Sequence, residues 1–328
     1  MSEKEMNGFD GLYGEICIAF IEYRRSIGYK YGERTVRAVR EMSRYLNEHT
    51  PDNTINLTKD LVLGYAAKRG NEKPMTQMRR EALIRQFAAY LNSIDKPAYV
   101  LPEHQNERCS FVPYIFTREQ ICSLLKAADD LQYAYRSPNM YYVYPFLIRL
   151  LYCCGLRISE ALSLNISDID FSDRVITVRQ SKYNNTRLVP MSESLFDCLR
   201  NYMNSVGYSE NDTGLLFRNR WGEAYRPGSI LQRYKKLLEE AGIPCASSGR
   251  LPRLHDLRHT FAVHALEGMG DKGIDAYVSL PYLEEYMGHR NIKCTEKYLR
   301  LTAESYDRII DALLPLYNDM LKGGDEDE

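Results

Sequence analysis

The chain has 328 residues, which is too many for one ordinary hydrophobic core and fits two domains. Its composition, 44% hydrophobic and 27% charged, is that of a folded globular protein and excludes a disordered or fibrous one. No apolar run approaches the roughly 20 residues of a membrane-spanning helix, and the first residues lack a signal-peptide pattern, so we expect a cytoplasmic protein. The net charge of −1 does not indicate nucleic acid, but the placement of basic residues is more informative than their total.

The cysteines and histidines give no sign of a metal site. The eight cysteines are scattered and form no Cys-x-x-Cys pair, which predicts a reduced interior without disulfides. The six histidines do not fall at the spacings of zinc fingers or metalloproteases. We therefore expect no metal site.

Residues 10–94 show helical periodicity, which predicts four helices near residues 12–28, 33–47, 59–68 and 75–91. Gly28 is the expected stop of the first helix and Thr58 the expected cap of the third. The second and fourth helices each carry a face of basic residues. Such a face either contacts DNA or is simply solvated and paired with acidic neighbours. Two basic faces in one small bundle favour DNA contact. The candidate DNA-contacting arginines are Arg34, Arg37, Arg40 and Arg44 on the second helix and Arg79, Arg80 and Arg85 on the fourth. We expect the three on the fourth helix to be exposed.

A second helical region follows a break in the pattern. Residues 95–114 contain prolines and no sustained period, which predicts a linker. Thr117 begins a capping-box sequence, and residues 140–164 read as the central core helix of a second domain, broken at Gly155. Arg157 stands at the break, with Ser159 as the expected cap and Glu160 in the next helical turn. A charge between apolar segments is costly unless it has a partner, so this arginine is not merely solvated. Structural pairing with Glu160 is the alternative to a functional role.

A β signal and two groups of functional side chains complete the chain. Residues 173–180 and 186–190 predict a hairpin whose turn carries Lys182, between the central helix and further helices near 193–206 and 229–241. The segment LPRLHDLRHTFAVH places His255, Arg258 and His259 together beside an apolar helical stripe. In YMGHRNIKCTEKY, a glycine-marked helix break separates His289 from the preceding helix. Tyr298 follows nine positions later, and by itself a tyrosine on a helix is more often packing than a nucleophile.

The candidate side chains comprise cations, imidazoles and one phenol, without a carboxylate cluster that would hold Mg²⁺. Paired arginines offer permanently charged, bidentate donors for a phosphate. Phosphoryl transfer without metal needs such a replacement for the charge of Mg²⁺. A tyrosine with an ordinary pKa near 10 becomes a nucleophile only if a nearby base takes its proton or its anion is stabilised. The set therefore suits attack by a tyrosine on a phosphodiester better than hydrolysis, since no group is dedicated to orienting water.

At these motifs the chain resembles the tyrosine recombinases, also called the phage-integrase family, over nearly its whole length. CCGLRISEALSL resembles the first arginine box, RQSKYNNTRLVP the β-hairpin lysine segment, LHDLRHTFAVH the His-x-x-Arg box, and YMGHRNIKCTEKY the final box. Each box is modest evidence alone, but their order along the chain is specific. The residues carried over from these boxes are Arg157, Glu160, Lys182, His255, Arg258, His289 and Tyr298.

The resemblance implies a mainly α, multidomain protein that closes around duplex DNA. Its parts would be a helical, SAM-like core-binding bundle over residues 8–96, a linker over 97–113, and a mixed α/β catalytic domain with a small β-sheet over 114–302. A C-terminal helix over 303–322 would contact a neighbouring protomer, and an acidic tail would cover 323–328. From these features we expect a protein that is monomeric alone and a synaptic tetramer on DNA.

The resemblance also implies a role for each site residue. Arg157 and Arg258 would hold the scissile phosphate, and Glu160 would order the pocket. Lys182 would protonate the leaving 5′ oxygen.

The remaining implied roles belong to the histidines and the tyrosine. His255 would act as acid or base, and His289 would stabilise the transition state. Tyr298 would form a 3′-phosphotyrosyl intermediate, which conserves bond energy so that neither ATP nor a metal is required.

Two departures from the family pattern refine the expectation. The interval from Arg258 to His289, which includes DKGIDAYVSLP, is longer than in compact members. The chain shows no additional N-terminal module of the kind that phage integrases use at arm sites, which favours a simple core-site recombinase or the integrase of a mobile element.

The alternatives are a type IB topoisomerase-like enzyme and a catalytically silent DNA-binding protein. The sequence does not specify the target site, the direction of the reaction, accessory proteins that set direction, or whether Tyr298 acts in its own protomer.

Overall fold

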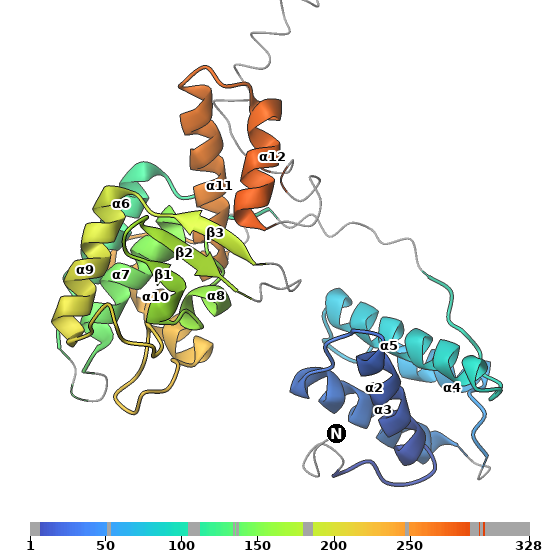
Figure 1. Cartoon of the computed structure of the whole chain (residues 1–328). Helices are drawn as coiled ribbons and strands as arrows, with labels where there is room; N and C mark the ends of the chain where they lie inside the picture. Colours follow the sequence, from blue (N-terminus) through green and yellow to red (C-terminus); the bar gives the residue numbers. More distant parts are fainter. Residues whose placement is uncertain are drawn as a thin grey trace, which may run out of the picture. The chain divides into compact units, whose positions relative to one another are not determined.

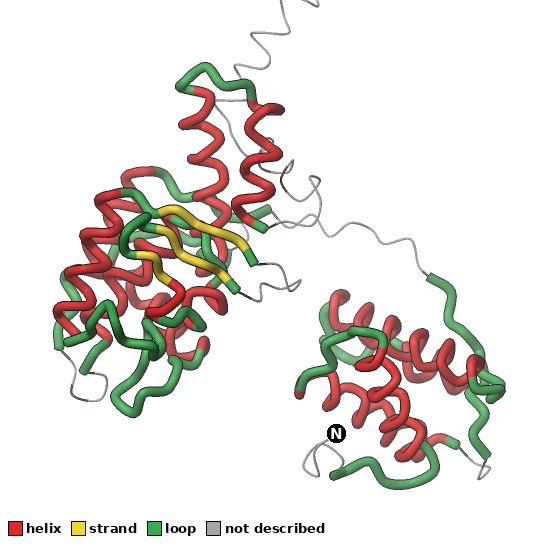
Figure 2. Tube along the Cα trace, in the orientation of Figure 1, coloured by secondary structure: helices red, strands yellow, loops and turns green. Residues whose placement is uncertain are grey.

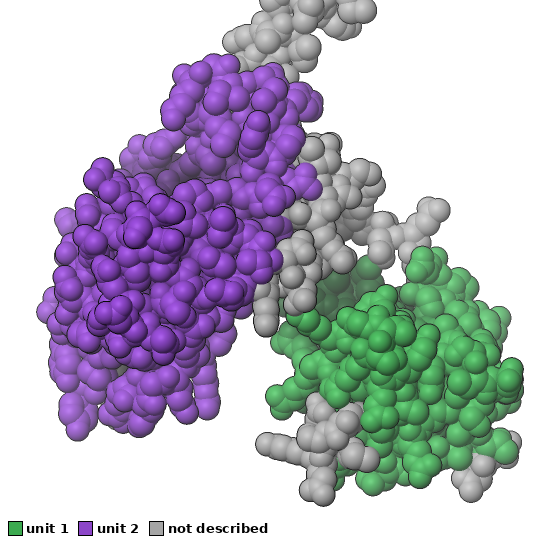
Figure 3. All heavy atoms as spheres, viewed as in Figure 1, with its two compact units in different colours: residues 1–110 green, residues 111–328 purple. Residues whose placement is uncertain are grey.

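The computed structural model describes residues 7–50, 54–103, 112–133, 135, 138–179, 186–246, 249–288, 295 and 298. The chain divides into two compact units, residues 1–110 and residues 111–328 (Figure 3). Within the described ranges, no helix is both long and apolar enough to cross a membrane.

Unit 1 is a helical bundle whose described helices are α2 (Gly14–Ser26), α3 (Glu33–His49), α4 (Lys59–Ala66) and α5 (Pro74–Ser93) (Figure 1). The predicted helices are confirmed with small shifts at their ends. The expected stop after α2 occurs, because Gly28 has a φ of 90° that continues no right-handed helix. The expected cap of α4 also forms, since the Thr58 hydroxyl accepts from the Leu61 N–H at 3.4 Å.

The end of α4 corrects two predictions made from the sequence. The helix ends at Ala66, two residues before its expected end, and Arg80 of α5 donates to the Tyr65 and Ala67 carbonyls there. Arg80 also pairs with Glu72 at 2.6 Å and is 10% exposed. It therefore caps a helix inside unit 1 instead of projecting into solvent, because helix C-termini leave carbonyls that need donors.

The core of unit 1 is aromatic and aliphatic. Phe20 is fully buried and meets Phe87 edge to face with ring centroids 5.4 Å apart. Leu101, within the range expected to be linker, packs into the same core, and Leu57 forms an isolated parallel bridge with Ala98. Packing in unit 1 thus extends through residue 101.

Unit 2 combines helices with a small sheet (Figure 2). Its described helices are α6 (Arg118–Asp129), α7 (Met140–Cys153), α8 (Ile158–Leu162), the 3-10 helix η1 (Ile166–Asp168), α9 (Glu193–Val206), α10 (Pro227–Glu240), α11 (Leu254–Gly270) and α12 (Ala276–Met287). Its strands are β1 (Ile169–Asp170), β2 (Val175–Val178) and β3 (Arg187–Pro190).

The strands form an antiparallel sheet in the order β1-β2-β3. The predicted hairpin is confirmed, with Val175 opposite Pro190 and Val178 opposite Arg187. The strand β1 escaped prediction because it has only two residues and gains its partner, Ile176, from the next strand. Successive residues of β3 alternate between buried and exposed, so Arg187 faces the interior together with Val189.

Helix α7 is the central core helix, as predicted, and contacts α6, α9 and α11. It ends before Gly155, whose φ is 57°. A Cβ atom at Gly155 would lie 2.4 Å from Cδ1 of Phe261 on α11, so only glycine allows this close approach. The expected cap at Ser159 is wrong: Arg157 is the N-cap of α8, and its backbone N–H donates to Glu160 Oε2 at 3.0 Å.

Helices α11 and α12 pack side by side as a hairpin (Figure 1). The segment that lengthens the interval between Arg258 and His289 forms the connection between α11 and α12 and the first turns of α12. Asp275 caps the start of α12, where its Oδ1 accepts from the Tyr277 N–H at 2.8 Å. The predicted break is confirmed at Gly288, which ends α12 with a φ of 61°. The two helices thereby bring the His-x-x-Arg segment close to the residues that follow α12.

Candidate active site

Glu160 is the anchor of a buried charge network between α8 and the sheet. It lies 2.5 Å from Arg157 Nη1 and 2.8 Å from Arg187 Nη2, and its side chain is 5% exposed. Burial alone would raise the pKa of Glu160, but hydrogen bonds and charge from Arg187, together with Arg157, outweigh it and lower the pKa to about 2. The carboxylate is therefore ionised at neutral pH and fixes two guanidinium groups.

Arg187 was not predicted as a site residue. Besides Glu160, it donates from Nε to the Tyr286 carbonyl at 3.0 Å, which ties β3 to the end of α12. The alternation along the hairpin was a usable signal, because it puts Arg187 on the same face as the buried Val189. A buried arginine on a short strand needs an acidic partner.

Arg258 lies at the junction of three segments and is 1% exposed. Its Nη1 donates to the Gly155 carbonyl at 2.6 Å and its Nη2 to the Met287 carbonyl at 2.5 Å. Glu160 Oε2 is 3.9 Å from Nη1. Burial lowers the pKa of Arg258 to about 9, and the positive charge of Arg157 adds to the effect. The guanidinium remains charged at pH 7, and the nearby Glu160 carboxylate offsets part of the cost of burying that charge.

His255 is on the first turn of α11, one turn before His259, and their rings meet edge to face at 4.8 Å. Partial burial of the ring lowers the pKa of His255 to about 4, and the charges of Arg258, Arg253 and Arg157 contribute further. The imidazole is therefore neutral at pH 7. A neutral imidazole accepts a proton, which suits a general base.

Tyr298 is 1% exposed and packs in an apolar cluster between α11 and α12 that includes Val263 and Leu283. Its hydroxyl lies 2.9 Å from Nδ1 of His259, and its backbone N–H donates to the Thr295 carbonyl at 2.9 Å. The sequence grouped His259 with His255 and Arg258, but gave no sign that it would contact Tyr298. The described position of the phenol is thus an interior one.

The structure brings together five of the seven expected site residues: Arg157, Glu160, His255, Arg258 and Tyr298. Arg157 and Arg258 lie beside Glu160, and Arg258 also donates to the Met287 carbonyl at the end of α12. The ring of His255 meets that of His259, which in turn contacts Tyr298. Lys182 and His289 lie outside the described residues, as does the expected C-terminal helix over 303–322.

The arginines of unit 1 divide into two groups. Arg34, Arg37, Arg44 and Arg79 are exposed, and Arg37 pairs with Glu41 at 3.1 Å. Arg40 is half-buried with its guanidinium 5.2 Å from the Phe9 ring centroid.

Two of the three α5 arginines that were expected to be exposed instead make hydrogen bonds within unit 1. Arg80 caps α4, and Arg85 is half-buried, donating to the carbonyls of Leu101 at 2.7 Å and Pro102 at 2.9 Å. Both arginines stabilise unit 1 through backbone carbonyls, which the helical pattern did not reveal.

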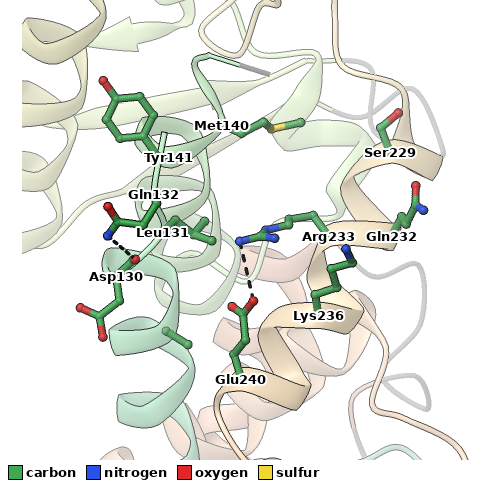
Figure 4. Close-up of a pocket in the computed structure, with 11 residues that line it drawn as sticks. Asp130, Leu131, Gln132, Met140, Tyr141, Ser229, Gln232, Arg233, Lys236 and Glu240 are labelled. Atoms are coloured by element: carbon green, nitrogen blue, oxygen red, sulfur yellow. Dashed lines mark hydrogen bonds and ion pairs between the residues drawn. The ribbon is translucent and has the colours of Figure 1, made fainter. Parts of the chain in front are cut away.

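A cavity of about 930 Å³ opens between the end of α6, the start of α7 and α10 (Figure 4). Met140 and Leu131 contribute apolar lining, and Arg233 pairs with Glu240 at 3.8 Å along its α10 side. The lining residues that the structure describes include none of the predicted site residues. We therefore assign the chemistry to the α8, α11 and α12 junction and not to this cavity.

Comparisons with known proteins agree with the motifs and the fold. The Phage integrase family profile matches residues 115–305. A putative integrase/recombinase, y4rB, of Sinorhizobium fredii is 31% identical over 85% of this chain and 90% of its own length. Tyrosine recombinase XerC of Chlamydia caviae is 30% identical over 75% of this chain and 74% of its own.

Two solved structures share the fold at lower identity. The Tn1549 transposon integrase in complex with circular intermediate DNA aligns with a TM-score of 0.62 at 20% identity, covering 86% of this chain and 94% of that one. The XerH site-specific recombinase bound to its difH substrate aligns with a TM-score of 0.61 at 18% identity, covering 84% and 77%. The chain therefore belongs to the phage integrase family and is a tyrosine recombinase, an enzyme that cleaves and rejoins DNA strands.

Proposed function

We propose that this recombinase cuts and rejoins duplex DNA at specific sites through a covalent bond between Tyr298 and a DNA 3′-phosphate. The Tyr298 oxygen attacks the scissile phosphorus, the bond from phosphorus to the 5′ oxygen breaks, and that oxygen leaves as a free hydroxyl. A 5′-hydroxyl from a partner duplex then attacks the phosphotyrosyl bond and releases the tyrosine. The observation that carries the proposal is a chain of contacts: Arg157 and Arg258 both lie beside Glu160, the ring of His255 meets that of His259 on α11, and His259 meets the Tyr298 hydroxyl.

Arg157 and Arg258 are the proposed phosphate-binding pair. Glu160 and the carbonyls of Gly155 and Met287 hold their guanidinium groups in place, so little side-chain freedom is lost when a phosphate binds. With Arg187, three guanidinium groups face one carboxylate. The excess positive charge favours an anion and stabilises the charge that builds on phosphorus during transfer.

His255 is the proposed acceptor of the Tyr298 proton, supported by its neutral ring at pH 7. The resemblance assigns protonation of the leaving 5′ oxygen to Lys182 and stabilisation of the transition state to His289. These roles balance the proton lost by the nucleophile against the proton gained by the leaving group.

We also infer that unit 1 is the core-site DNA-binding domain and residues 114–302 the catalytic domain, with double-stranded DNA sites as the partner. A tetramer on DNA, linked by the helix over 303–322, would align two duplexes for exchange, and accessory proteins would set its direction. We favour the integrase of a mobile element or phage, supported by the names of the relatives, an integrase/recombinase and a transposon integrase. Acting on DNA, it would work in the cytoplasm.

The proposal is tested by trapping the enzyme on nicked suicide substrates built from the DNA that flanks its gene. Tyr298→Phe should abolish covalent attachment and leave DNA binding within about two-fold. Tyr277→Phe, which changes a 70% exposed tyrosine at the start of α12, is the matched control and should trap normally. Continued trapping by Tyr298→Phe would contradict the nucleophile assignment, and relaxation of supercoiled DNA without strand exchange would favour the topoisomerase-like alternative.

A further inference from the structure

The carboxyl end of α12 is held by two buried arginines from different elements. Arg187, the first residue of β3, donates from Nε to the Tyr286 carbonyl at 3.0 Å. Arg258 on α11 donates to the next carbonyl, that of Met287, at 2.5 Å. The last carbonyls of a helix have no partner within it, so each needs a donor from elsewhere. The two arginines together fix the end of α12 against β3 and α11.

The same two arginines meet at the carboxylate of Glu160. Arg187 donates to both carboxylate oxygens, from Nη2 to Oε2 at 2.8 Å and from Nη1 to Oε1 at 3.2 Å. Arg258 lies 3.9 Å from Oε2, and Arg157 binds Oε1 at 2.5 Å. Arg187 thereby links the carboxylate that orients Arg157 to the helix end that orients Arg258.

The surroundings of Arg187 leave its side chain little freedom. It is 5% exposed, and a Cβ atom at Gly288 would lie 3.2 Å from its Cδ, so the glycine that ends α12 packs directly on it. Each of its three guanidinium nitrogens donates to Glu160 or to Tyr286. Because the donor directions of a guanidinium group are fixed, these bonds set the carboxylate and the helix end relative to each other.

We propose that Arg187 is a positioning residue for strand cleavage, which sets the geometry of the two phosphate-binding arginines by joining Glu160 to the end of α12. The inference rests on the proposed function, because it takes Arg157 and Arg258 as the groups that bind the scissile phosphate. A planar fork of donors can hold a carboxylate and a carbonyl together, whereas an ammonium group is a point charge. Arg187→Lys therefore keeps the charge and loses the geometry.

Helix α7 supplies a matched control. Arg149 also binds a carboxylate through two nitrogens, with Nη1 and Nη2 each 2.7 Å from an oxygen of Asp129. It also donates to a backbone carbonyl, that of Pro145, at 2.9 Å. None of these three residues is an expected site residue. Arg149→Lys thus removes the same kind of fork without touching Glu160 or α12.

The test measures the single-turnover rate of strand cleavage by the full-length enzyme on suicide DNA at saturating concentration. Rates are taken per molecule able to bind DNA, so a loss of folded protein does not count as slow cleavage. Arg187→Lys should cleave at least about ten-fold more slowly, with Kd within about two-fold of the wild type, because a 1 Å misplacement of reacting groups costs about 100-fold. Arg187→Gln should lose at least as much, which keeps the test open if the lysine variant does not fold. Arg149→Lys should stay within about two-fold in both rate and Kd.

Two modified substrates separate the positioning of the arginines from other defects. A methylphosphonate at the scissile position replaces a nonbridging oxygen and removes its negative charge, so cleavage depends less on the arginines. On this substrate the rate of Arg187→Lys should come within about three-fold of the wild type. A 5′-bridging phosphorothioate, whose sulfur leaves as a thiolate without being protonated, should not reduce the loss.

Four results would each overturn the inference: cleavage by Arg187→Lys within about two-fold of the wild type, an equal loss in Arg149→Lys, an equal loss on the methylphosphonate, or rescue by the phosphorothioate. The last would show that Arg187 acts through the protonation assigned to Lys182. All four compare variants with a wild type that forms its covalent adduct. Failure of the proposed function differs from these, because it appears as the absence of a Tyr298 adduct in the wild type itself.

Discussion

Replacing Glu160 by glutamine tests whether the buried network stabilises unit 2. The change keeps the side chain's shape and removes the charge that pairs with Arg157 and with Arg187, whose side chain is 5% exposed. The difference between the ordinary pKa of 4.5 and about 2 corresponds to about 3 kcal/mol of unfolding free energy at neutral pH. Leaving a buried guanidinium without its partner costs a similar amount, about 3–5 kcal/mol.

The sign of the pH dependence follows from the lowered pKa. Because the folded-state pKa of Glu160 lies below the unfolded one, its contribution is complete above about pH 4.5 and is lost as the pH falls toward 2. At pH 3.5 about 2 kcal/mol of it should remain. The difference between wild type and Glu160→Gln should therefore shrink from pH 7 to pH 3.5.

Urea unfolding followed by circular dichroism measures this difference at both pH values. Glu210→Gln is the control, because Glu210 pairs with Arg200 at 3.4 Å on the surface, where both side chains are about half exposed. An exposed pair contributes about 0–1 kcal/mol, so this variant should change little. A loss below about 1 kcal/mol for Glu160→Gln at pH 7, or a loss that grows as the pH falls, would refute the reasoning.

Three further predictions follow from the described contacts. Gly155→Ala should lower the unfolding free energy by about 3 kcal/mol in urea unfolding, from backbone strain plus the clash with α11, whereas Gly207→Ala, at a φ of 74° with open space around it, should cost about 1 kcal/mol; equal losses would contradict the packing argument. The second-order rate of covalent trapping should fall as the pH drops through about 4, where His255 of the free enzyme gains its proton, and a fall centred near 6.5 would contradict its assignment as the base. Arg79→Ala should weaken DNA binding and reduce the slope of log Kd against log salt by about 0.9, whereas Arg85→Ala should lower the stability of unit 1 by about 1–2 kcal/mol without changing that slope, as measured by salt titrations and urea unfolding.

Local sequence signals predicted much of the fold. Helix α9 spans residues 193–206 as expected, because Ser192 caps its start and Gly207 ends it in the left-handed conformation. The hairpin and the breaks at Gly155 and Gly288 were also predicted, since each depends on neighbouring residues and their backbone preferences. Elements that depend on neighbouring residues could therefore be predicted from the sequence.

Contacts between segments that are distant in the sequence could not be predicted in this way. Arg187 finds Glu160 27 residues away, and Arg80 finds the end of α4 15 residues away. On a strand or helix considered alone, both arginines resemble ordinary solvated positions. Their burial arises only when other elements fold against them.

The candidate site shows the same division. The boxes located Arg157, Arg258 and Tyr298, and the fold brings their elements together. The sequence did not show that Tyr298 would contact His259, because two positions separated by 39 residues carry no local sign of contact. The final box therefore identified Tyr298 as the candidate nucleophile but did not predict its contact with His259.

The central claim is that Tyr298 becomes the covalent attachment point for DNA. The most direct measurement is to trap the wild-type enzyme on a suicide substrate, digest the DNA and the protein, and identify the modified peptide by mass spectrometry. We predict a nucleotide 3′-phosphate on Tyr298 in peptide 297–304. A nucleotide adduct on any other peptide, with peptide 297–304 unmodified, would contradict the account.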